Sequence, residues 1–328
     1  MNIVLLHEPI PKGASKDAQD VCLQADMVAK ALTDLGHTTR TLHFSLNLQN
    51  ILDQLHAINP DIVFNLVESV ADNGALIHMA PAILDILKMP YTGSRTDALF
   101  LTSNKLLAKR LLKASGIPTP DWVTRETIDE HRVHVNAPYI VKSVWEHASI
   151  GLTNDSIVIP ENREQLLDEI IRREEDTGKT CFAERYVDGR EFNLSLLENG
   201  HSIEFLPIAE MRFVNFPEGK WKILDYASKW ETGSFEYSHT QRSFDLPDHD
   251  CSLLKKLTEI ARKSWDIFGL RGYSRIDFRV DTYDEPWVLE INANPCISPN
   301  SGFVASAEEA GLHFNQIIER IVHASFTE

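Results

Sequence analysis

The chain has 328 residues, of which 43% are hydrophobic and 24% are charged, and its formal net charge is −16. This length exceeds the size at which a single hydrophobic core keeps growing, so two or three subdomains are expected. The negative charge argues against nonspecific binding to nucleic acid or to anionic membranes, although a local cluster of lysine and arginine can still hold a nucleotide. No apolar run is long enough to span a bilayer.

Cysteine usage and the N-terminal sequence predict where the protein works. Cys22, Cys181, Cys251 and Cys296 lie far apart and show no spacing typical of a zinc site. They indicate reduced thiols in a cytoplasmic protein. The sequence MNIVLLHEP enters a short apolar strand without a basic leader, so no signal peptide is predicted.

The first third of the chain alternates between predicted strands and helices. Strands are predicted over 2–6, 38–44 and 61–67, and helices over about 21–35, 47–58 and 74–88. This alternation predicts a parallel, doubly wound α/β sheet, whose ligands bind at the carboxyl ends of strands. Glu8 and Glu68 lie at such ends, although a solvated loop charge is the simpler interpretation of Glu8. No G-x-G-x-x-G or G-x-x-x-x-G-K-[ST] sequence occurs, which disfavours a dinucleotide dehydrogenase or a P-loop enzyme.

The rest of the chain is predicted to form a mixed antiparallel sheet with helices, so the fold class is α/β followed by α+β. A helix is predicted to begin after Thr102 as its N-cap and to stop at Gly116, and another to begin at Asn162. Strands are predicted over 138–143, 155–159, 180–187, 190–197 and 202–208, and further helices near 249–268 and 314–324. Residues 213–247 are predicted to form a lid or binding loop.

Two strands near the C-terminus, YSRIDFRVD and PWVLEINANP, are predicted to pair as a hairpin across the turn sequence DTYDEP. The hairpin is expected to close with Val280 opposite Trp287. Because side chains alternate along a strand, Val288 is expected on the same face as Glu290 and Asn292.

The same register places two carboxylates face to face. Asp277 then lies opposite Glu290, and Arg275 lies opposite Asn292. Like charges directly opposed destabilise a sheet, so a bound cation is one remedy, and oxygen-only ligands suit magnesium. A salt-bridge patch in which Arg275 and Arg279 neutralise the acids explains the pattern equally well.

Two further segments suggest phosphate and nucleotide chemistry only weakly when each is taken alone. Lys142 ends the strand PYIVKS and precedes small residues, including Ser149 and Gly151, that suit a backbone closing over phosphate. A surface lysine at a strand end is the commoner interpretation of such a residue. Glu184 and Glu191 bracket the sequence ERYVDGRE, for which a solvated hairpin end is the simplest interpretation.

Taken in chain order, these segments closely resemble the ATP-grasp superfamily, in particular its D-alanine–D-alanine ligase branch. The resemblance runs over nearly the whole chain and is strongest in RIDFRVDTYDEPWVLEINANP. It implies an N-terminal parallel α/β (pre-ATP-grasp) domain over 1–98 and an ATP-grasp domain over 99–328. The latter would comprise a central subdomain over about 102–185 and a C-terminal subdomain over about 186–328.

The resemblance also implies an ATP site. The lysines expected to contact the phosphates are Lys105, Lys142 and the lid residue Lys229. The residues expected to receive adenine and ribose are Glu184, the backbone of Tyr186 and Val187, and Glu191. Two Mg²⁺ ions are expected, and Mn²⁺ can replace them. Their expected ligands are Asp277, Glu290 and Asn292.

The implied activity is an ATP-dependent ligation of two amino acids through an acyl phosphate, with Arg275, Lys142 and Ser149 as catalytic residues. Ser301 is expected to receive the carboxylate of the second amino acid. Glu68 stands where the family has histidine, and we hypothesise that it pairs with the ammonium of the first. Cys296 replaces a family glycine, and we interpret it as a packed thiol rather than a nucleophile.

Small amino acids are the expected partners, neither nucleic acid nor a membrane is expected to bind, and a homodimer fits the family. Two alternative functions stay open at this point. One keeps the fold but transfers phosphate without ligation. The other is a nonenzymatic regulatory module that binds a nucleotide. The sequence leaves open which amino acids are joined and whether they are D or L.

Overall fold

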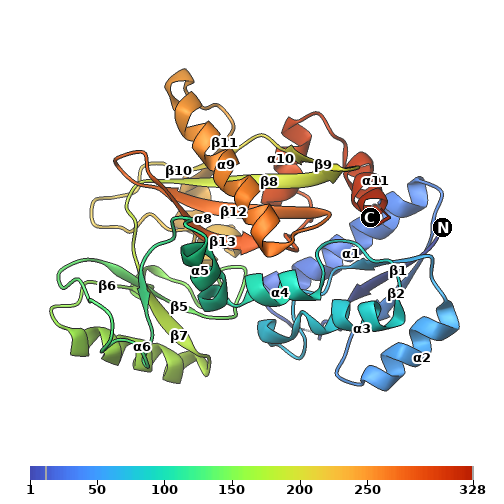
Figure 1. The fold of residues 1–328 in the computed structure, drawn as a ribbon, viewed down its shortest axis with the longest axis horizontal. Coiled ribbons are helices and arrows are strands. Elements are labelled where there is room, and N and C mark those ends of the chain that lie inside the picture. The colour runs from blue at the N-terminus through green and yellow to red at the C-terminus, as the bar shows by residue number, and fades with distance from the viewer. Residues whose placement is uncertain (12, 327–328) are drawn as a thin grey trace.

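The computed structural model describes residues 1–11 and 13–326, which are arranged around three β-sheets (Figure 1). The N-terminal sheet has the strand order β2-β1-β3, and both pairings are parallel, as the sequence predicts. Its strands are β1 (Asn2–His7), β2 (Thr38–His43) and β3 (Ile62–Asn65). The helices of this region are α1 (Lys16–Asp34), α2 (Leu48–Ile58) and α3 (Met79–Leu87), with a short 3-10 turn, η1 (Gly74–Leu76), before α3.

The second sheet is antiparallel and is formed by the middle part of the chain, and we call it the central sheet. Its order is β4-β7-β5-β6, with strands β4 (Trp122–Val123), β5 (Tyr139–Ser143), β6 (Ile157–Val158) and β7 (Cys181–Arg185). Helix α6 (Arg163–Thr177) packs on β5 and β7 through Leu166 and Ile170. Asn162 caps this helix as predicted, because its side chain accepts a hydrogen bond from the Gln165 amide at 2.8 Å.

The third sheet is the largest and has the order β11-β10-β8-β12-β13, with β9 paired to β8. All its pairings are antiparallel. Its strands are β8 (Arg190–Asn199), β9 (Ser202–Phe205), β10 (Ala209–Phe213), β11 (Thr240–Ser243), β12 (Tyr273–Val280) and β13 (Pro286–Asn292). The helices that follow β11 are α9 (Cys251–Phe268), α10 (Gly302–Glu309) and α11 (Phe314–Ala324), and α11 packs beside α1.

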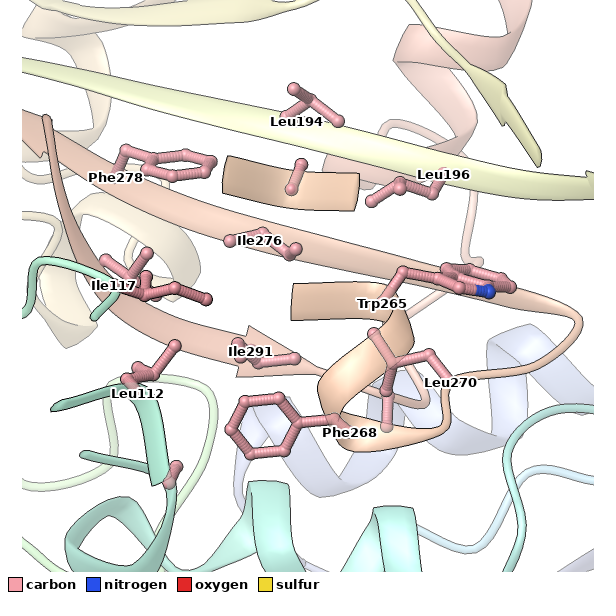
Figure 2. Close-up of a cluster of buried hydrophobic side chains, with 14 of the residues drawn as sticks. Leu112, Ile117, Leu194, Leu196, Trp265, Phe268, Leu270, Ile276, Phe278 and Ile291 are labelled. Atoms are coloured by element: carbon pink, nitrogen blue, oxygen red, sulfur yellow. The ribbon is translucent and has the colours of Figure 1, made fainter. Parts of the chain in front are cut away.

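The main hydrophobic core lies between the third sheet and the helices α5 (Lys105–Ala114) and α9. Figure 2 shows Ile276 and Phe278 of β12 and Ile291 of β13 facing Trp265 and Phe268 of α9. This apolar layer covers the sheet face opposite the one that carries Asp277 and Glu290. Its burial is the main contribution of that face to the stability of the protein. Of the helices that the structure describes, none combines the length and apolar character that crossing a membrane requires.

The predicted helix begins at Lys105 rather than directly after Thr102, and a helix that the sequence analysis does not predict precedes it. Thr102 is not an N-cap but lies inside α4 (Thr96–Ser103), where its hydroxyl donates to the Ala98 carbonyl at 2.8 Å. The chain then becomes extended at Asn104, whose side chain accepts from the Leu107 amide at 2.9 Å and so caps α5 (Lys105–Ala114). This break places Lys105 at the first position of a new helix.

The β12–β13 hairpin contains a bulge that the sequence analysis does not predict. Asp277 pairs with Glu290 as expected, but the next pair is Phe278 with Val288, so Leu289 is an extra residue on β13. The bulge reverses the alternation of side chains before it. Val288 is therefore in the hydrophobic core, and its expected position beside Glu290 is wrong.

The register beyond the bulge also differs from the expectation. Val280 pairs with Pro286 and not with Trp287, whereas Arg275 pairs with Asn292 as predicted. The predicted lid segment, residues 213–247, is only partly a loop. It contains α7 (Tyr226–Trp230), α8 (Phe235–His239) and strand β11.

Candidate active site

A cavity lies between the central sheet and the third sheet, and the lid segment forms part of its wall. Most of the predicted site residues line it, namely Lys105, Lys142, Ser149, Glu184, Tyr186, Val187, Glu191, Lys229, Asp277 and Glu290. Segments that are up to 185 residues apart in the chain, from Lys105 to Glu290, therefore meet at one place. Arg275, Asn292, Glu68 and Ser301 are not among the described lining residues.

Glu184 is a buried carboxylate held between two lysines. Lys109 Nζ and Lys142 Nζ each lie 2.5 Å from one of its oxygens. Burial alone would raise the pKa of Glu184, but the two ammonium groups outweigh burial and hold this pKa below its usual value. Glu184 is thus ionised, and the solvated hairpin end considered for it is wrong.

Lys109 is a site residue that the sequence analysis missed. It lies on α5, is 1% exposed, and donates to Thr119 Oγ1 at 2.6 Å and to the Pro120 carbonyl at 2.9 Å. Burial lowers the pKa of Lys109 to about 8, although Glu184 opposes the shift. The only available signal was its place four residues after Lys105 on one helix face.

Asp277 is surrounded by hydrogen-bond donors. Arg275 Nε and Nη2 donate to its two oxygens at 2.7 and 2.8 Å. Asn193 Nδ2 donates at 2.7 Å, and Asn292 Nδ2 donates at 3.2 Å. Of the two arginines in the salt-bridge interpretation, Arg275 contacts the carboxylate proposed as a metal ligand, whereas Arg279 pairs with Glu191.

Glu290 lies on strand β13, directly opposite Asp277 of strand β12. Its Oε1 is 3.3 Å from Lys105 Nζ and 3.3 Å from His147 Nδ1. Burial would raise the pKa of Glu290, but Lys105 and then His147 outweigh burial and hold the pKa well below its usual value. Within the described residues, this buried oxygen accepts no hydrogen bond of ordinary geometry, so it remains open to a cation.

The donor set suits a hard divalent cation. Asp277 and Glu290 supply carboxylates, and Asn292 supplies an amide oxygen because its nitrogen already donates to Asp277. Mg²⁺ prefers such oxygen ligands and usually completes its shell with water and substrate phosphates. Within residues 1–11 and 13–326, no cluster of three or more His, Cys, Asp or Glu offers a self-sufficient metal centre. The residues therefore fit Mg²⁺ bound jointly with a phosphate ligand.

The far end of the cavity is apolar and ends in a carboxylate. Ile140, Tyr186 and Ile223 form a small buried cluster there. Glu191 is buried beside Arg279, whose Nε is 3.4 Å from its Oε2. Burial raises the pKa of Glu191, and Arg279 opposes this shift. Such an apolar slot beside a carboxylate can receive a purine ring and its ribose hydroxyls.

The small-residue loop after β5 is attached to the lid segment. Ser149 Oγ donates to the Leu224 carbonyl at 2.7 Å, and Trp230 Nε1 donates to the Ala148 carbonyl at 3.1 Å. Ala148 and Ser149 both adopt positive φ, so the loop turns sharply at this point. Lys229 lines the cavity beneath this junction, and burial followed by the nearby Arg275 lowers its pKa.

Glu8 and Glu68 meet at the carboxyl ends of β1 and β3. Glu8 is only 7% exposed and accepts from the Ser69 amide at 3.1 Å, so its interpretation as a solvated loop charge is wrong. Glu68 accepts from Gln24 Nε2 at 2.7 Å. Burial raises the pKa of Glu68 to about 8, and neighbouring Glu8 adds to this shift.

Cys296 and Ser301 lie on the segment between β13 and α10. Cys296 Sγ donates to Asp20 Oδ2 at 3.0 Å and lies 3.0 Å from Ser298 Oγ. Burial, together with Glu68, raises the pKa of this thiol well above its usual value, which favours a protonated, packed thiol. Ser301 is the N-cap of α10 and accepts from the Val304 amide at 3.3 Å.

Comparison with known proteins identifies relatives over nearly the whole chain. The family model described as the D-ala D-ala ligase C-terminus matches residues 111–323. The chain is 32% identical to a D-alanine–D-alanine ligase of Aquifex aeolicus, covering 94% of this chain and 97% of the relative. It is 27% identical to that of Carboxydothermus hydrogenoformans, covering 94% and 95% of the two chains.

A solved structure has the same fold. The D-alanine–D-alanine ligase of Bacillus anthracis, in a crystal structure complexed with ATP, matches with a TM-score of 0.71 over 99% of this chain and 97% of that chain, at 20% identity. The family match spans more than half of the chain, and the Aquifex relative is similar in both length and sequence. This chain therefore belongs to the D-alanine–D-alanine ligase family of ATP-dependent, peptide-bond-forming enzymes.

Proposed function

We propose that the cavity binds ATP with divalent metal and that the protein joins two amino acids through an acyl phosphate. One observation carries this proposal. Asp277 and Glu290 face each other across paired strands at the cavity wall, within reach of lysines that come from three separate segments. This arrangement of acids and amines matches the tail of a metal-bound nucleoside triphosphate.

ATP is proposed to lie along the cavity with its adenine in the apolar slot. The Tyr186 amide already donates to the Pro138 carbonyl at 2.9 Å, which leaves the backbone of Val187 to recognise the adenine edge. Glu191 would accept hydrogen bonds from the ribose hydroxyls. The residues proposed to contact the phosphates are Lys105, Lys142 and Lys229, with the loop carrying Ser149.

Asp277, Glu290 and Asn292 are proposed to hold two Mg²⁺ ions, which Mn²⁺ can replace. When bound, the metal would neutralise charge on the phosphates during transfer. Arg275 keeps Asp277 neutralised through Nε and Nη2, so its Nη1 remains available to a negatively charged group of the bound substrates. Removing such a cationic group from the site is expected to lower the rate by roughly 100-fold to 1000-fold.

The proposed reaction has two steps. A substrate carboxylate oxygen attacks the γ-phosphorus of ATP, and ADP leaves, giving an acyl phosphate. The amine of the second substrate then attacks the acyl carbon, loses a proton and expels phosphate. Glu68, whose raised pKa means that its carboxyl must lose a proton when the ligand binds, is proposed to pair with the ammonium of the first substrate, and Ser301 to receive the carboxylate of the second. The protein mainly supplies positioning and charge neutralisation.

The domain assignment also remains a proposal, with a boundary at 98/99 and a subdomain boundary near 185/186. The cavity lies between the two proposed subdomains of the ATP-grasp domain, and such interfaces commonly bind ligands. A homodimer is proposed from the family resemblance alone, and sedimentation velocity of the purified protein tests it.

The decisive experiment is a phosphate-release screen with ATP, Mg²⁺ and pairs of D- and L-amino acids, with products identified by mass. Phosphate release is expected to require both a carboxylate and an amine, and Asp277→Asn is expected to abolish it. Phosphate release with a carboxylate alone and no ligated product would favour phosphotransfer. Tight ATP binding without turnover of any pair would favour a regulatory module.

A further inference from the structure

Arg242 lies on β11, at the edge of the third sheet, and the sequence analysis gave it no role. Its Nη1 donates to the Asn300 carbonyl at 3.2 Å. Its Nε is buried and has no hydrogen-bond partner among the described residues. No carboxylate of residues 1–11 or 13–326 forms an ion pair with this guanidinium. Arg242 therefore carries a partly buried positive charge that no carboxylate of the described residues neutralises.

A second guanidinium lies beside it. Arg275 uses Nε and Nη2 for Asp277, and its Nη1 is directed to the start of α10. A Cβ placed on Gly302 would stand 3.2 Å from Arg275 Nη1 and 3.9 Å from Arg242 Nη2. The two arginines therefore converge over the first residue of this helix, and the absence of a side chain at Gly302 keeps the space between them open.

The N-terminal end of helix α10 adds to the positive potential of the two arginines. Ser301 caps α10 at the Val304 amide, while the first backbone N–H groups of a helix have no partner within the helix. These groups and the helix dipole favour an anion at this end. Burial lowers the pKa of Arg242, and repulsion by the nearby Arg275 lowers it further. A bound anion would relieve that repulsion.

We propose that Arg242 binds the carboxylate of the amine-donating substrate, together with Arg275 Nη1 and the start of α10. This inference rests on the proposed ligase function. It adds a residue that selects, as the second substrate, an amine with a negatively charged carboxylate. A nucleotide phosphate is the less suitable anion, because the described lining of the ATP cavity includes Arg279 and Lys229 but not Arg242. The amine donor should thus be an α-amino acid with a free carboxylate.

The test compares an acid with its neutral amide as the amine donor. The probes are D-alanine and D-alaninamide, or the donor found in the phosphate-release screen and its amide. Arg242→Gln is expected to lower kcat/KM for the acid by roughly 10-fold to 100-fold, the range for losing a charge-assisted hydrogen bond. It should change kcat/KM for the amide and KM for ATP by less than about 2-fold.

Arg212→Gln is the matched control, because Arg212 lies on the adjacent strand β10 and its charge is neutralised by Glu210 at 3.1 Å. This variant should leave the preference for acid over amide unchanged. Arg242→Lys keeps the charge but loses the two-pronged geometry, so it should retain part of the preference. It also provides the measurement if Arg242→Gln does not fold.

An unchanged preference in Arg242→Gln, or in Arg242→Lys if only that variant folds, overturns the inference while leaving the ligase function intact. An equal loss for acid and amide also overturns it, because that result indicates a structural role. If the wild-type protein turns over no pair of amino acids, the proposed function itself fails, and the inference fails with it.

Discussion

Lys109 shows how one buried residue supports the site without lining the ATP cavity. Lys109 pairs with Glu184 from outside the cavity, while Lys142, which lines the cavity, pairs with the same carboxylate. An isolated carboxylate at this depth would be costly, so the pair of lysines is what allows Glu184 to stay ionised. Part of the positive charge of Lys142 is balanced before any phosphate arrives.

Replacing Lys109 should therefore cost stability as well as ATP binding. Lys109→Met leaves Glu184 with one cation, and we expect the free energy of unfolding to fall by about 3–5 kcal/mol. Lys113→Met is the matched control on the same helix, because Lys113 pairs with Asp121 at the surface and its loss should cost less than about 1 kcal/mol. Urea denaturation measures both. Equal effects of the two substitutions would contradict the role given to Lys109.

Glu68 predicts a pH dependence of stability. Burial raises the pKa of its carboxyl to about 8 in the folded protein, so between roughly pH 4.5 and 8 the folded state binds more protons than the unfolded state. Its contribution to stability is present at low pH and is lost as the pH rises through 8. Glu68→Gln removes this loss.

The expected difference is measurable by thermal unfolding. Between pH 5 and pH 9, wild-type protein should lose roughly 1–3 kcal/mol more stability than Glu68→Gln. This range is smaller than the full pKa shift implies, because the Glu68 side chain is partly exposed and its charge is screened by solvent. The same variant should raise KM for the amino acid whose ammonium pairs with Glu68. Parallel pH profiles together with an unchanged KM for every amino substrate would refute the assignment.

At the scale of single elements, the bulge in β13 decides which side chains meet the ligand. Val288 packs with Ile291 in the core, whereas Leu289 lines the cavity next to Glu290. Strict alternation would give the opposite arrangement. At the bulge, the Val288 amide instead bonds to the Pro118 carbonyl at 2.9 Å, and Thr119 Oγ1 donates to the Val288 carbonyl at 2.8 Å.

Because of the bulge, Val288 is expected to contribute to stability and the adjacent Leu289 to ATP binding. Val288→Ala should lower the free energy of unfolding by roughly 2 kcal/mol through lost packing and leave KM for ATP nearly unchanged. Leu289→Ala should have the reverse effect, with a raised KM for ATP and a stability loss below about 1 kcal/mol. Chemical denaturation and steady-state kinetics measure the two quantities. The opposite pattern would indicate that Val288 faces the ligand.

The elements also show what the sequence could and could not predict. The parallel β2-β1-β3 sheet and the opposition of Asp277 and Glu290 followed from period and register, which depend on local pattern. The bulge at Leu289 and the break at Asn104 did not, because tertiary contacts with the Pro118–Thr119 segment and the side-chain cap select them. Lys109 and Arg242 were missed because their meaning depends on partners far away in the chain.

At the scale of the whole molecule, the N-terminal region reaches across the site to the lid. Tyr226 of α7 donates to Asp17 Oδ1 at 2.9 Å, and Lys16 donates to the Trp230 carbonyl at 2.9 Å. The lid is in turn bonded to the loop that carries Ser149. Hydrogen bonds therefore join the N-terminal region, the lid and the Ser149 loop, which lets a substrate bound at one of these parts influence the others.

This arrangement predicts that one hydroxyl controls how often the lid opens. Tyr226→Phe removes the bond to Asp17, and hydrogen exchange of residues 222–234 should become about 10-fold faster, the equivalent of one charge-assisted hydrogen bond. Tyr237→Phe, at an exposed position on the neighbouring α8, should not change the exchange. Adding ATP with Mg²⁺ should slow exchange in both variants, because Lys229 would then contact the phosphates. Unaltered exchange in Tyr226→Phe would mean that the bonds from Ser149 and Trp230 hold the lid without help from the N-terminal region.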